Sequence, residues 1–156
     1  MNSGLTGVRI DAALPENAGE IAALHARLFA EPWNAQSIVR LIEHPAAMTT
    51  LARGEVAGAL VGFLMAQAAA DEVEILSIGV APEWQRRGIA RRLIEDLMTR
   101  TAERGARYLH VEVAADNDAA IALYVALGFQ PNGRRNGYYV RGNAPPADAL
   151  LLVKPL

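Results

Sequence analysis

The sequence predicts a mixed α/β fold in which helices flank a central sheet of mostly antiparallel strands. Residues 72–80 are apolar and β-branched enough to form a buried strand. Residues 85–90 then open a helix in which apolar side chains recur at i, i+3 and i+4 spacing. Residues 108–113 form the next strand. Because a crossover through a helix makes these two strands parallel, the predicted sheet is mixed.

Before residue 72 we expect one strand, two helices and a hairpin. The first helix carries a stripe of Ile21, Leu24 and Leu28. It ends before Pro32, because proline disfavours a helical conformation at the preceding residue. Asn34 is of the residue type that caps a helix, so a second helix should follow it. The strands are expected at residues 8–10, 48–51 and 56–66, with the hairpin turn at residues 52–55.

After residue 113 we expect a helix that Asn117 and its two aspartate neighbours cap and that Gly128 ends. A strand in two short pieces should follow, at residues 129–133 and 138–140 with an interruption at residues 134–137. A loop rich in Pro, Gly and Asn at residues 141–148 and a last strand at residues 149–153 complete the chain. The order is strand, two helices, three strands, helix, strand, helix and two strands. No repeat or linker is visible, so we expect a single domain over residues 1–156.

Composition limits the class of protein. The chain has 156 residues, of which 52% are hydrophobic, and a net charge of −2. This balance argues against general nucleic-acid binding, which needs a basic excess. There are no cysteines, and His25, His44 and His110 lie far apart, so we expect no metal site. No signal peptide or membrane span is visible, so we expect a cytoplasmic protein.

The start of the helix after residue 84 is the predicted anion site. The free N–H groups of a first helical turn and the helix dipole attract negative charge. A P-loop is excluded because no Lys follows Gly88, and a dinucleotide fingerprint would need three spaced glycines. The run Gln85, Arg86, Arg87, Gly88, Ile89, Ala90 fits the pattern [Q/R]-x-x-G-x-[G/A].

That pattern, between a strand end and an amphipathic helix, resembles the acetyl-CoA pyrophosphate motif of the GNAT acetyltransferases. The order of elements is also that of the GNAT fold. The resemblance implies acetyl-CoA as cosubstrate, bound through the residues of the motif. It also places Ile78, Gly79 and Val80 on the cosubstrate, where the strand splays from its neighbour, with the Val80 N–H polarising the thioester carbonyl. The alternative for Gly79 is a glycine that relieves crowding under a helix.

Glu112 is the candidate general base. In the strand over residues 108–113, Leu109, Val111 and Val113 face one way, so Glu112 faces the other. A carboxylate in a buried strand is costly unless it is solvated or paired, which suggests a functional role. The resemblance implies that this glutamate accepts the proton of the acceptor amine. Other GNAT branches use a glutamate on the preceding strand, so Glu72 and Glu74 are rival bases.

Tyr124 is the candidate general acid. The segment from Asn117 to Phe129 is similar to the family's N-x-x-A-x-x-L-Y-x-x-x-G-F string. The resemblance implies that Tyr124 protonates the departing CoA thiolate and that Asn117 contacts CoA. Tyr124 also shares a helical stripe with Leu127, so a place in the core is compatible with this role. Arginines of the preceding helix either reach the cosubstrate's 3′-phosphate or form a solvated face; they are Arg91, Arg92, Arg100, Arg104 and Arg107.

The acceptor is suggested by three local features that resemble the RimI-like branch of the family. They are a Phe-x-x-Pro-Trp segment ending at Trp33, the combination of Glu112 with Tyr124, and the run from Arg134 to Tyr139. The extra Gly137 departs from the branch pattern. The resemblance implies that Trp33, Tyr138 and Tyr139 wall the slot for a protein N-terminus, often one that begins with alanine, such as that of a small-subunit ribosomal protein.

We therefore expect an acetyl-CoA-dependent N-α-acetyltransferase that works by direct attack in a ternary complex. The alternatives are a GNAT that acts on a lysine side chain or a small-molecule amine, and a non-catalytic acyl-CoA-binding module. An interaction scaffold that binds no CoA is disfavoured by the intact motif at residues 85–90. The acceptor's identity, the oligomeric state and the need for a partner protein stay open.

Overall fold

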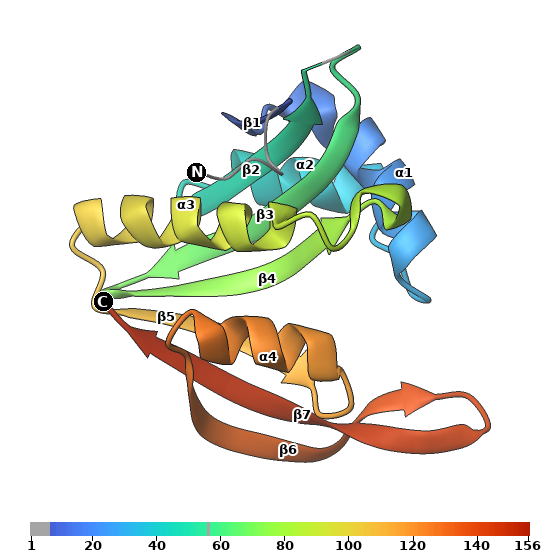
Figure 1. Cartoon of the computed structure of the whole chain (residues 1–156), viewed down its shortest axis with the longest axis vertical. Coiled ribbons are helices and arrows are strands. Elements are labelled where there is room, and N and C mark those ends of the chain that lie inside the picture. Colours follow the sequence, from blue (N-terminus) through green and yellow to red (C-terminus); the bar gives the residue numbers. More distant parts are fainter. Residues whose placement is uncertain (1–6, 56) are drawn as a thin grey trace.

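The computed structural model describes residues 7–55 and 57–156, in which seven strands form one mixed sheet. The strands lie in the order β1-β2-β3-β4-β5-β7-β6. Only β4 and β5 are parallel, and every other neighbouring pair is antiparallel. Figure 1 shows the strands running from β1 at the top to β6 at the bottom. The predicted mixed sheet and the predicted order of elements are both confirmed.

The strands are β1 (Val8–Ala12), β2 (Ala47–Gly54), β3 (Leu60–Ala69), β4 (Glu72–Val80), β5 (Tyr108–Ala114), β6 (Gln130–Arg141) and β7 (Ala144–Pro155). The helices are α1 (Ala18–Leu28), α2 (Ala35–Glu43), α3 (Ile89–Glu103) and α4 (Asp118–Ala126). Short 3-10 turns lie at Pro15–Asn17 and Pro82–Trp84. The predicted caps are present, since the Asn34 side chain accepts from the Ser37 N–H and the Asn117 side chain accepts from the Ala120 N–H.

One layer of helices covers each face of the sheet. Helices α1 and α2 pack on one face of β2 and β3, against a core that includes Leu51, Phe63 and Met65. Helices α3 and α4 pack on the opposite face, against a second core that includes Leu64 and Leu109. In Figure 1, α3 and α4 lie in front of the sheet and α1 and α2 lie behind it. The alternation of side chains along each strand sends neighbouring residues to opposite cores.

The first hairpin turns later than the sequence predicted. Strand β2 continues to Gly54 and β3 begins at Leu60, so the expected turn at residues 52–55 was wrong. Gly58 has φ +62° and supplies the left-handed conformation that the turn needs. Residue 56, where we expected the second strand to begin, lies outside the described residues. The β2–β3 register shifts beside Gly62, so β3 is irregular there.

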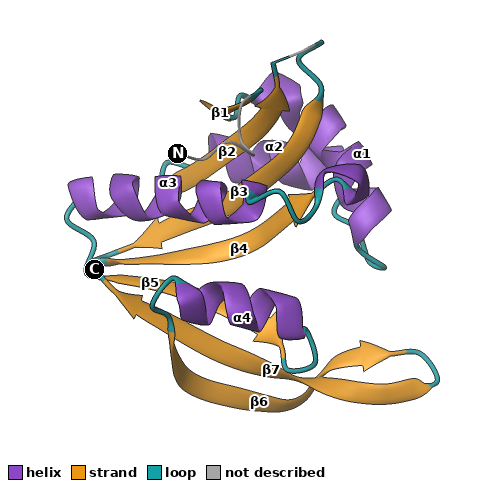
Figure 2. Ribbon diagram, in the orientation of Figure 1, coloured by secondary structure: helices purple, strands orange, loops and turns teal. Residues whose placement is uncertain are grey.

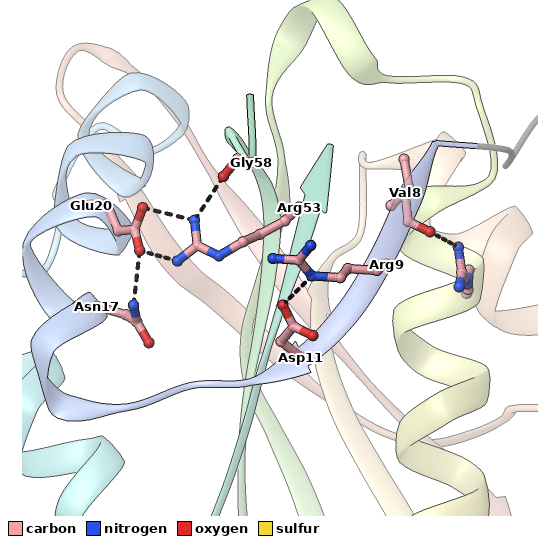
Figure 3. Close-up of polar contacts among 8 residues, drawn as sticks. Val8, Arg9, Asp11, Asn17, Glu20, Arg53 and Gly58 are labelled. Atoms are coloured by element: carbon pink, nitrogen blue, oxygen red, sulfur yellow. Dashed lines mark hydrogen bonds and ion pairs between the residues drawn. The ribbon is translucent and has the colours of Figure 1, made fainter. Parts of the chain in front are cut away.

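A part-buried ion pair holds this hairpin to α1. The Arg53 guanidinium on β2 bonds both carboxylate oxygens of Glu20 and also donates to the Gly58 carbonyl oxygen at 3.2 Å. Figure 3 shows Arg53 reaching across from the strand to Glu20, with Asn17 donating to the same carboxylate. The Arg53 hydrogen bond lowers the pKa of Glu20. The pair fixes the start of α1 to the sheet and so helps to position the helix end that reaches the site.

The last hairpin differs most from the prediction. Residues 134–137 and 141–148 were expected to interrupt or follow short strands, but β6 and β7 are both continuous and pair along most of their length. The register shifts between Arg135 and Tyr139, where Gly137 takes φ +60° and donates its N–H to Asp148 at 2.7 Å. The extra glycine therefore forms a bulge in a strand rather than a loop.

Within the described residues, no helix has both the length and the apolar content to cross a lipid bilayer.

Candidate active site

The sheet opens between β4 and β5. These parallel strands pair only from Glu72 with Tyr108 to Ile75 with Val111, although β4 runs on to Val80. Strand β5 instead stays paired with β7 along its whole length, so the two halves of the sheet diverge. Figure 2 shows the resulting gap between the β4 and β5 ribbons. Residues 76–80 therefore have no strand partner on the β5 side.

The backbone of β4 presents free groups to this opening. Ala81 donates its N–H to Val61 at 2.8 Å, which makes Ala81 with Val61 a hydrogen-bonded pair. Hydrogen-bonded and non-hydrogen-bonded pairs alternate in an antiparallel ladder, so Val80 lies at a non-hydrogen-bonded pair with β3. The same alternation applies to Ile78. The N–H groups of Ile78 and Val80 consequently point toward β5, where the ladder has ended.

The glycine of this strand has a packing role. A Cβ atom on Gly79 would lie 2.6 Å from a methyl carbon of Leu28 and 2.9 Å from the Phe63 ring, which is closer than real contacts allow. The β3–β4 register shifts beside Leu76, two strand positions before Ile78, and not at Gly79. The irregularity of β4 thus lies at Leu76, and the packing around Gly79 agrees with the expected relief of crowding under a helix. Gly79 lets β4 pass close beneath α1.

The predicted anion site is a turn that precedes α3. The helix begins at Ile89, after a turn in which Arg86 and Gly88 both have positive φ values, 62° and 80°. A left-handed conformation at a non-glycine residue is strained, and such strain often accompanies function. No side chain caps this end, and the first intrahelical hydrogen bond runs from Arg92 to Gly88 at 3.1 Å. The N–H groups of the first turn are therefore available to an anion.

The loop is tied to the strand end. The Gln85 side-chain amide donates to the Val80 carbonyl oxygen at 3.0 Å. This bond holds the turn next to the free N–H of Val80. Glutamine at the first motif position therefore has a structural role, linking the anion site to the open edge of β4.

A cleft of about 920 Å³ passes through the opening. It brings together most of the predicted site residues, which come from β4, the turn before α3, β5, α4, the segment after α1, and β6. Those lining it are Glu112, Tyr124, Ile78, Gly79, Val80, Gln85, Arg86, Gly88, Ile89, Ala90, Asn117, Trp33 and Tyr139. Two others do not line it. Arg87 stacks over the Trp84 ring at 4.7 Å, and Tyr138 is 49% exposed on β6.

Glu112 lies at the edge of this cleft and is paired. Leu109, Val111 and Val113 are buried, which confirms the predicted alternation along β5. The Glu112 carboxylate lies 3.1 Å from Nε of Arg135, which reaches over from β6. Burial, and next the charge of Glu112, raise the pKa of Tyr139. The rival carboxylates are elsewhere: neither Glu72 nor Glu74 lines the cleft.

Tyr124 approaches the cleft from the opposite face. It is only 3% exposed and packs edge-on against Phe129, with ring centroids 5.1 Å apart. Burial raises the pKa of the Tyr124 phenol well above its ordinary value. Its hydroxyl therefore stays protonated across the neutral range. Tyr124 is both a core residue and a cleft residue, as the sequence allowed.

The face of the cleft formed by the segment after α1 is aromatic. The buried His25 ring stacks on Phe29 and Trp33, with centroids 4.3 and 5.1 Å away. The backbone N–H of Trp33 donates to Nδ1 of His25 at 3.1 Å. Nε2 of the same ring lies 3.3 Å from Oγ of Ser77 on β4. Trp33 is thus packed against α1 and lines the cleft as well.

Four of the arginines between residues 91 and 107 already have intramolecular partners. Arg92 donates to the Val8 carbonyl oxygen, Arg100 pairs with Asp96 at 2.9 Å, and Arg107 stacks over Tyr108. Arg91 lines the cleft while pairing with Glu95 at 2.7 Å. Arg86, in the turn before α3, and Arg91, in the first turn of α3, are therefore the arginines of this region that line the cleft.

Sequence reasoning missed two residues that line the cleft, His25 and Ser77, and the partner of Glu112, Arg135. His25 lies one turn after Ile21, so the helical period alone placed it on the buried face of α1. Ser77 is the one hydroxyl in the otherwise apolar centre of β4. The sequence pattern could therefore have pointed to both His25 and Ser77. Arg135 carried none, because its approach to Glu112 depends on how β6 is bulged over β7.

The residues fit an extended ligand with an anionic end. The uncapped α3 terminus suits phosphate groups, and the unpaired edge of β4 suits an amide-containing chain that hydrogen-bonds like a strand. An acyl-CoA has both parts. In this arrangement the ligand's acyl end would lie at the opening between β4 and β5, within the cleft that Glu112 and Tyr124 also line.

Comparisons with known proteins agree with this geometry. The profile of the Acetyltransferase (GNAT) family matches residues 18–129. The ribosomal protein bS18 alanine N-acetyltransferase of Escherichia coli (strain K12) is 37% identical over 99 residues, which cover 64% of this chain and 66% of that protein. The matched segment is thus just under two thirds of that relative's length.

A second relative matches more of the chain. The N-alpha-acetyltransferase RimI of Mycobacterium tuberculosis is 38% identical over 145 residues, 89% of each chain. The crystal structure of the ribosomal-protein-S18-alanine N-acetyltransferase from Escherichia coli superposes with a TM-score of 0.88 at 28% identity, covering 95% of this chain and 93% of that one. The predicted GNAT fold and the predicted relation to RimI are confirmed. The chain belongs to the GNAT acetyltransferase family.

Proposed function

We propose that this protein is an acetyl-CoA-dependent N-acetyltransferase that acts on the N-terminal α-amine of a protein, with alanine as a preferred first residue. A small-subunit ribosomal protein is the proposed acceptor. The proposal is supported by the relatives, one of which is named for acetylating alanine of ribosomal protein bS18 and another for N-α-acetylation. We further propose that the chain is a single domain and works in the cytoplasm.

One observation carries the proposal. The cleft runs through the sheet at the point where β4 and β5 separate, so it is open to both faces. On the α3 and α4 face it offers the anion site and Tyr124. On the α1 face it offers Glu112, Tyr139 and the aromatic group around Trp33. Two substrates that approach from opposite faces would meet at the free N–H of Val80.

Acetyl-CoA supplies an acetyl group on a thioester, and the acceptor nitrogen replaces the sulfur at the carbonyl carbon. The nitrogen arrives largely as an ammonium, because an α-amine has a pKa of about 7.7–8. The Glu112 carboxylate attracts this cation and takes one proton from it, directly or through water. Because the α-amine loses its proton more readily than a lysine amine, a carboxylate is an adequate base.

Val80 and Tyr124 act on the carbonyl oxygen and the sulfur of the thioester. The Val80 N–H faces the opening and donates to the carbonyl oxygen as negative charge develops there. Tyr124 gives its proton to the departing sulfur and regains one from the nitrogen. The ammonium thus loses two protons, of which one leaves through Glu112 to water and one reaches the sulfur. No cysteine is present to form a covalent acetyl-enzyme, which favours direct transfer.

The test is intact-mass spectrometry of two short peptides incubated with the protein and acetyl-CoA. One peptide begins with a free alanine, and the other has the same composition but a blocked N-terminus and an internal lysine. The proposal predicts a gain of about 42 daltons, one acetyl group, on the alanine peptide alone. Transfer to the lysine peptide alone would replace the proposal with side-chain acetylation.

A third outcome separates catalysis from binding. If neither peptide gains mass while acetyl-CoA still raises the melting temperature, the protein is a binding module or uses a small-molecule amine. If acetyl-CoA also leaves the melting temperature unchanged, the proposed cosubstrate is wrong.

A further inference from the structure

A part-buried polar pair beside the cleft has no part in the proposed proton transfers. His25 of α1 is 2% exposed, and its ring is enclosed by Phe29, Trp33 and Phe63. Its Nε2 lies 3.3 Å from Oγ of Ser77 on β4. Both residues line the cleft.

The hydrogen bonds fix which atom donates. Because the Trp33 N–H donates to Nδ1 of His25, that nitrogen carries a lone pair. The buried ring is neutral, since burial lowers the pKa of His25, and its single proton is therefore on Nε2. Nε2–H donates to the Ser77 oxygen. The Ser77 hydroxyl proton is then turned away from His25 and free to donate to a ligand in the cleft.

The position of Ser77 determines which ligand it meets. The last β4–β5 pair is Ile75 with Val111, so Ser77 and Glu112 lie just beyond the point of separation on the two strands. Ser77 faces α1, as its contact with His25 shows, and Glu112 faces the same side because Val111 and Val113 face the other core. The hydroxyl and the carboxylate thus flank the acceptor side of the opening.

These two groups complement the end of a peptide chain. An N-terminal residue carries a cationic nitrogen and, one carbon away, a carbonyl oxygen. Glu112 accepts from the nitrogen, and a donor is needed for the oxygen. A lysine side chain has the same nitrogen but only methylene groups beside it, so it cannot use such a donor.

We propose that Ser77 donates a hydrogen bond to the first carbonyl oxygen of the acceptor peptide, and that His25 is the positioning residue that orients it. Ser77 is then a specificity-determining residue that favours an α-amine over a lysine side chain. This inference rests on the proposed function, since it names how that same site recognises its acceptor.

The test is a thermodynamic cycle of the double-mutant kind, in which the Ser77 hydroxyl and the first carbonyl oxygen of the peptide are removed singly and together. The first substrate is an alanine peptide, and the second is the same peptide with its first amide replaced by an (E)-alkene, which lacks the carbonyl oxygen. Each is measured as kcat/KM and, without turnover, as Kd in the presence of CoA. The variants are Ser77→Ala, Ser77→Thr as the rescue, and Thr99→Ala as the control. Thr99 is an exposed α3 residue whose hydroxyl bonds only the Glu95 carbonyl oxygen.

The wild-type protein should lose about 3- to 10-fold in kcat/KM and affinity on going from amide to alkene, the range for one neutral hydrogen bond. Ser77→Ala should lose a similar factor with the amide peptide and show no further loss with the alkene. Ser77→Thr and Thr99→Ala should match the wild type. If Ser77→Ala lowers kcat/KM equally with both substrates, or does not lower it with the amide, the role of Ser77 is wrong. The proposed function would be unaffected by that result. Absence of any transfer to the alanine peptide by the wild type would overturn the proposed function and the inference together.

Discussion

Glu112 is the side chain on which the proposed chemistry depends most. Its carboxylate is mostly enclosed by β5 and the cleft, and its one ion-pair partner among the described residues is Arg135. The Arg135 side chain is 56% exposed. Such an exposed pair is worth only about 0–1 kcal/mol, so an arriving ammonium can replace the guanidinium. Arg135 would then occupy the place of the acceptor's amine between turnovers.

Glu112→Gln should lower kcat by about 10²- to 10⁴-fold, the usual contribution of a general base. The acetyl-CoA affinity should stay unchanged, because Glu112 faces away from the anion site. The matched control is Glu74→Gln, which makes the same change on the adjacent strand outside the cleft. Initial rates and calorimetric CoA binding measure both effects. A larger loss in the Glu74 variant would move the base to β4.

Arg135→Gln should lower the KM for the alanine peptide by up to about 5-fold, because the carboxylate is no longer occupied. Arg134→Gln is the control, since the neighbouring guanidinium pairs with Asp148 at 2.7 Å instead. Steady-state kinetics with varied peptide compares the two. A higher KM in the Arg135 variant would mean that this arginine helps to bind the acceptor rather than competing with its amine for Glu112.

Tyr124→Phe should reduce kcat by about 10- to 100-fold with little change in KM, because the sulfur loses its proton donor. Burial raises the pKa of Tyr124, so ionisation of this phenol should cause no decline in the wild-type rate between pH 7 and about 10. The pH–rate profiles of both proteins provide the measurement. A basic limb near pH 9 that disappears in the Phe variant would contradict the buried, protonated state.

At the scale of elements, His25 joins α1 to β4, and the pH dependence of the protein's stability can show whether this histidine is buried and neutral. Burial lowers the pKa of His25 below its value of 6.5 in the unfolded chain. Between the two pKa values the unfolded state binds more protons, so this residue's contribution to stability falls as the pH drops below about 6.5 and is constant above it.

His25→Phe keeps the aromatic stack but cannot be protonated. The melting temperature of the wild type should therefore fall more steeply between pH 7 and pH 5 than that of the His25→Phe protein. The control is His44→Asn, at the exposed residue after α2, which should follow the wild type. Parallel curves for wild type and His25→Phe would show that the buried ring is not the source of the pH dependence.

The elements that the sequence predicted well are those whose local pattern and tertiary role agree. Strand β4 was predicted with its observed bounds, because most of its residues are apolar and Pro82 follows soon after its end at Val80. Helices α2 and α4 begin after the asparagines that were expected to cap them. For these elements the local preferences and the packing favour the same structure.

The last hairpin was missed because composition and pairing disagree there. Pro145 and Pro146 favour a loop by composition, yet both lie in β7 between the paired positions Ala144 and Ala147. Before Ala149 the strand pairs with β6 alone, so prolines are tolerated on its free side. The Arg135–Glu112 contact depends on this hairpin, and so no local pattern could have revealed it.

At the scale of the whole molecule, the site is a consequence of sheet topology. The parallel pair β4–β5 is short, and each strand is held by an antiparallel neighbour on its other side. The opening is therefore built into the sheet and is closed by no element in the described part of the chain. In the proposed function, the residues that bind the cosubstrate lie on the α3 and α4 face, and those that bind the acceptor lie on the α1 face.

The central claim is that CoA and a protein N-terminus meet in this opening. The direct test is calorimetric binding of two conjugates in which CoA is joined through an acetyl bridge to a peptide, in one case at the α-nitrogen of alanine and in the other at a lysine side chain. Linking two ligands that occupy adjacent sites raises affinity by about 10²- to 10⁴-fold. The proposed site should show this gain over CoA alone for the α-linked conjugate, and little gain for the lysine-linked one. Equal affinity of the two conjugates, or no gain for either, would contradict it.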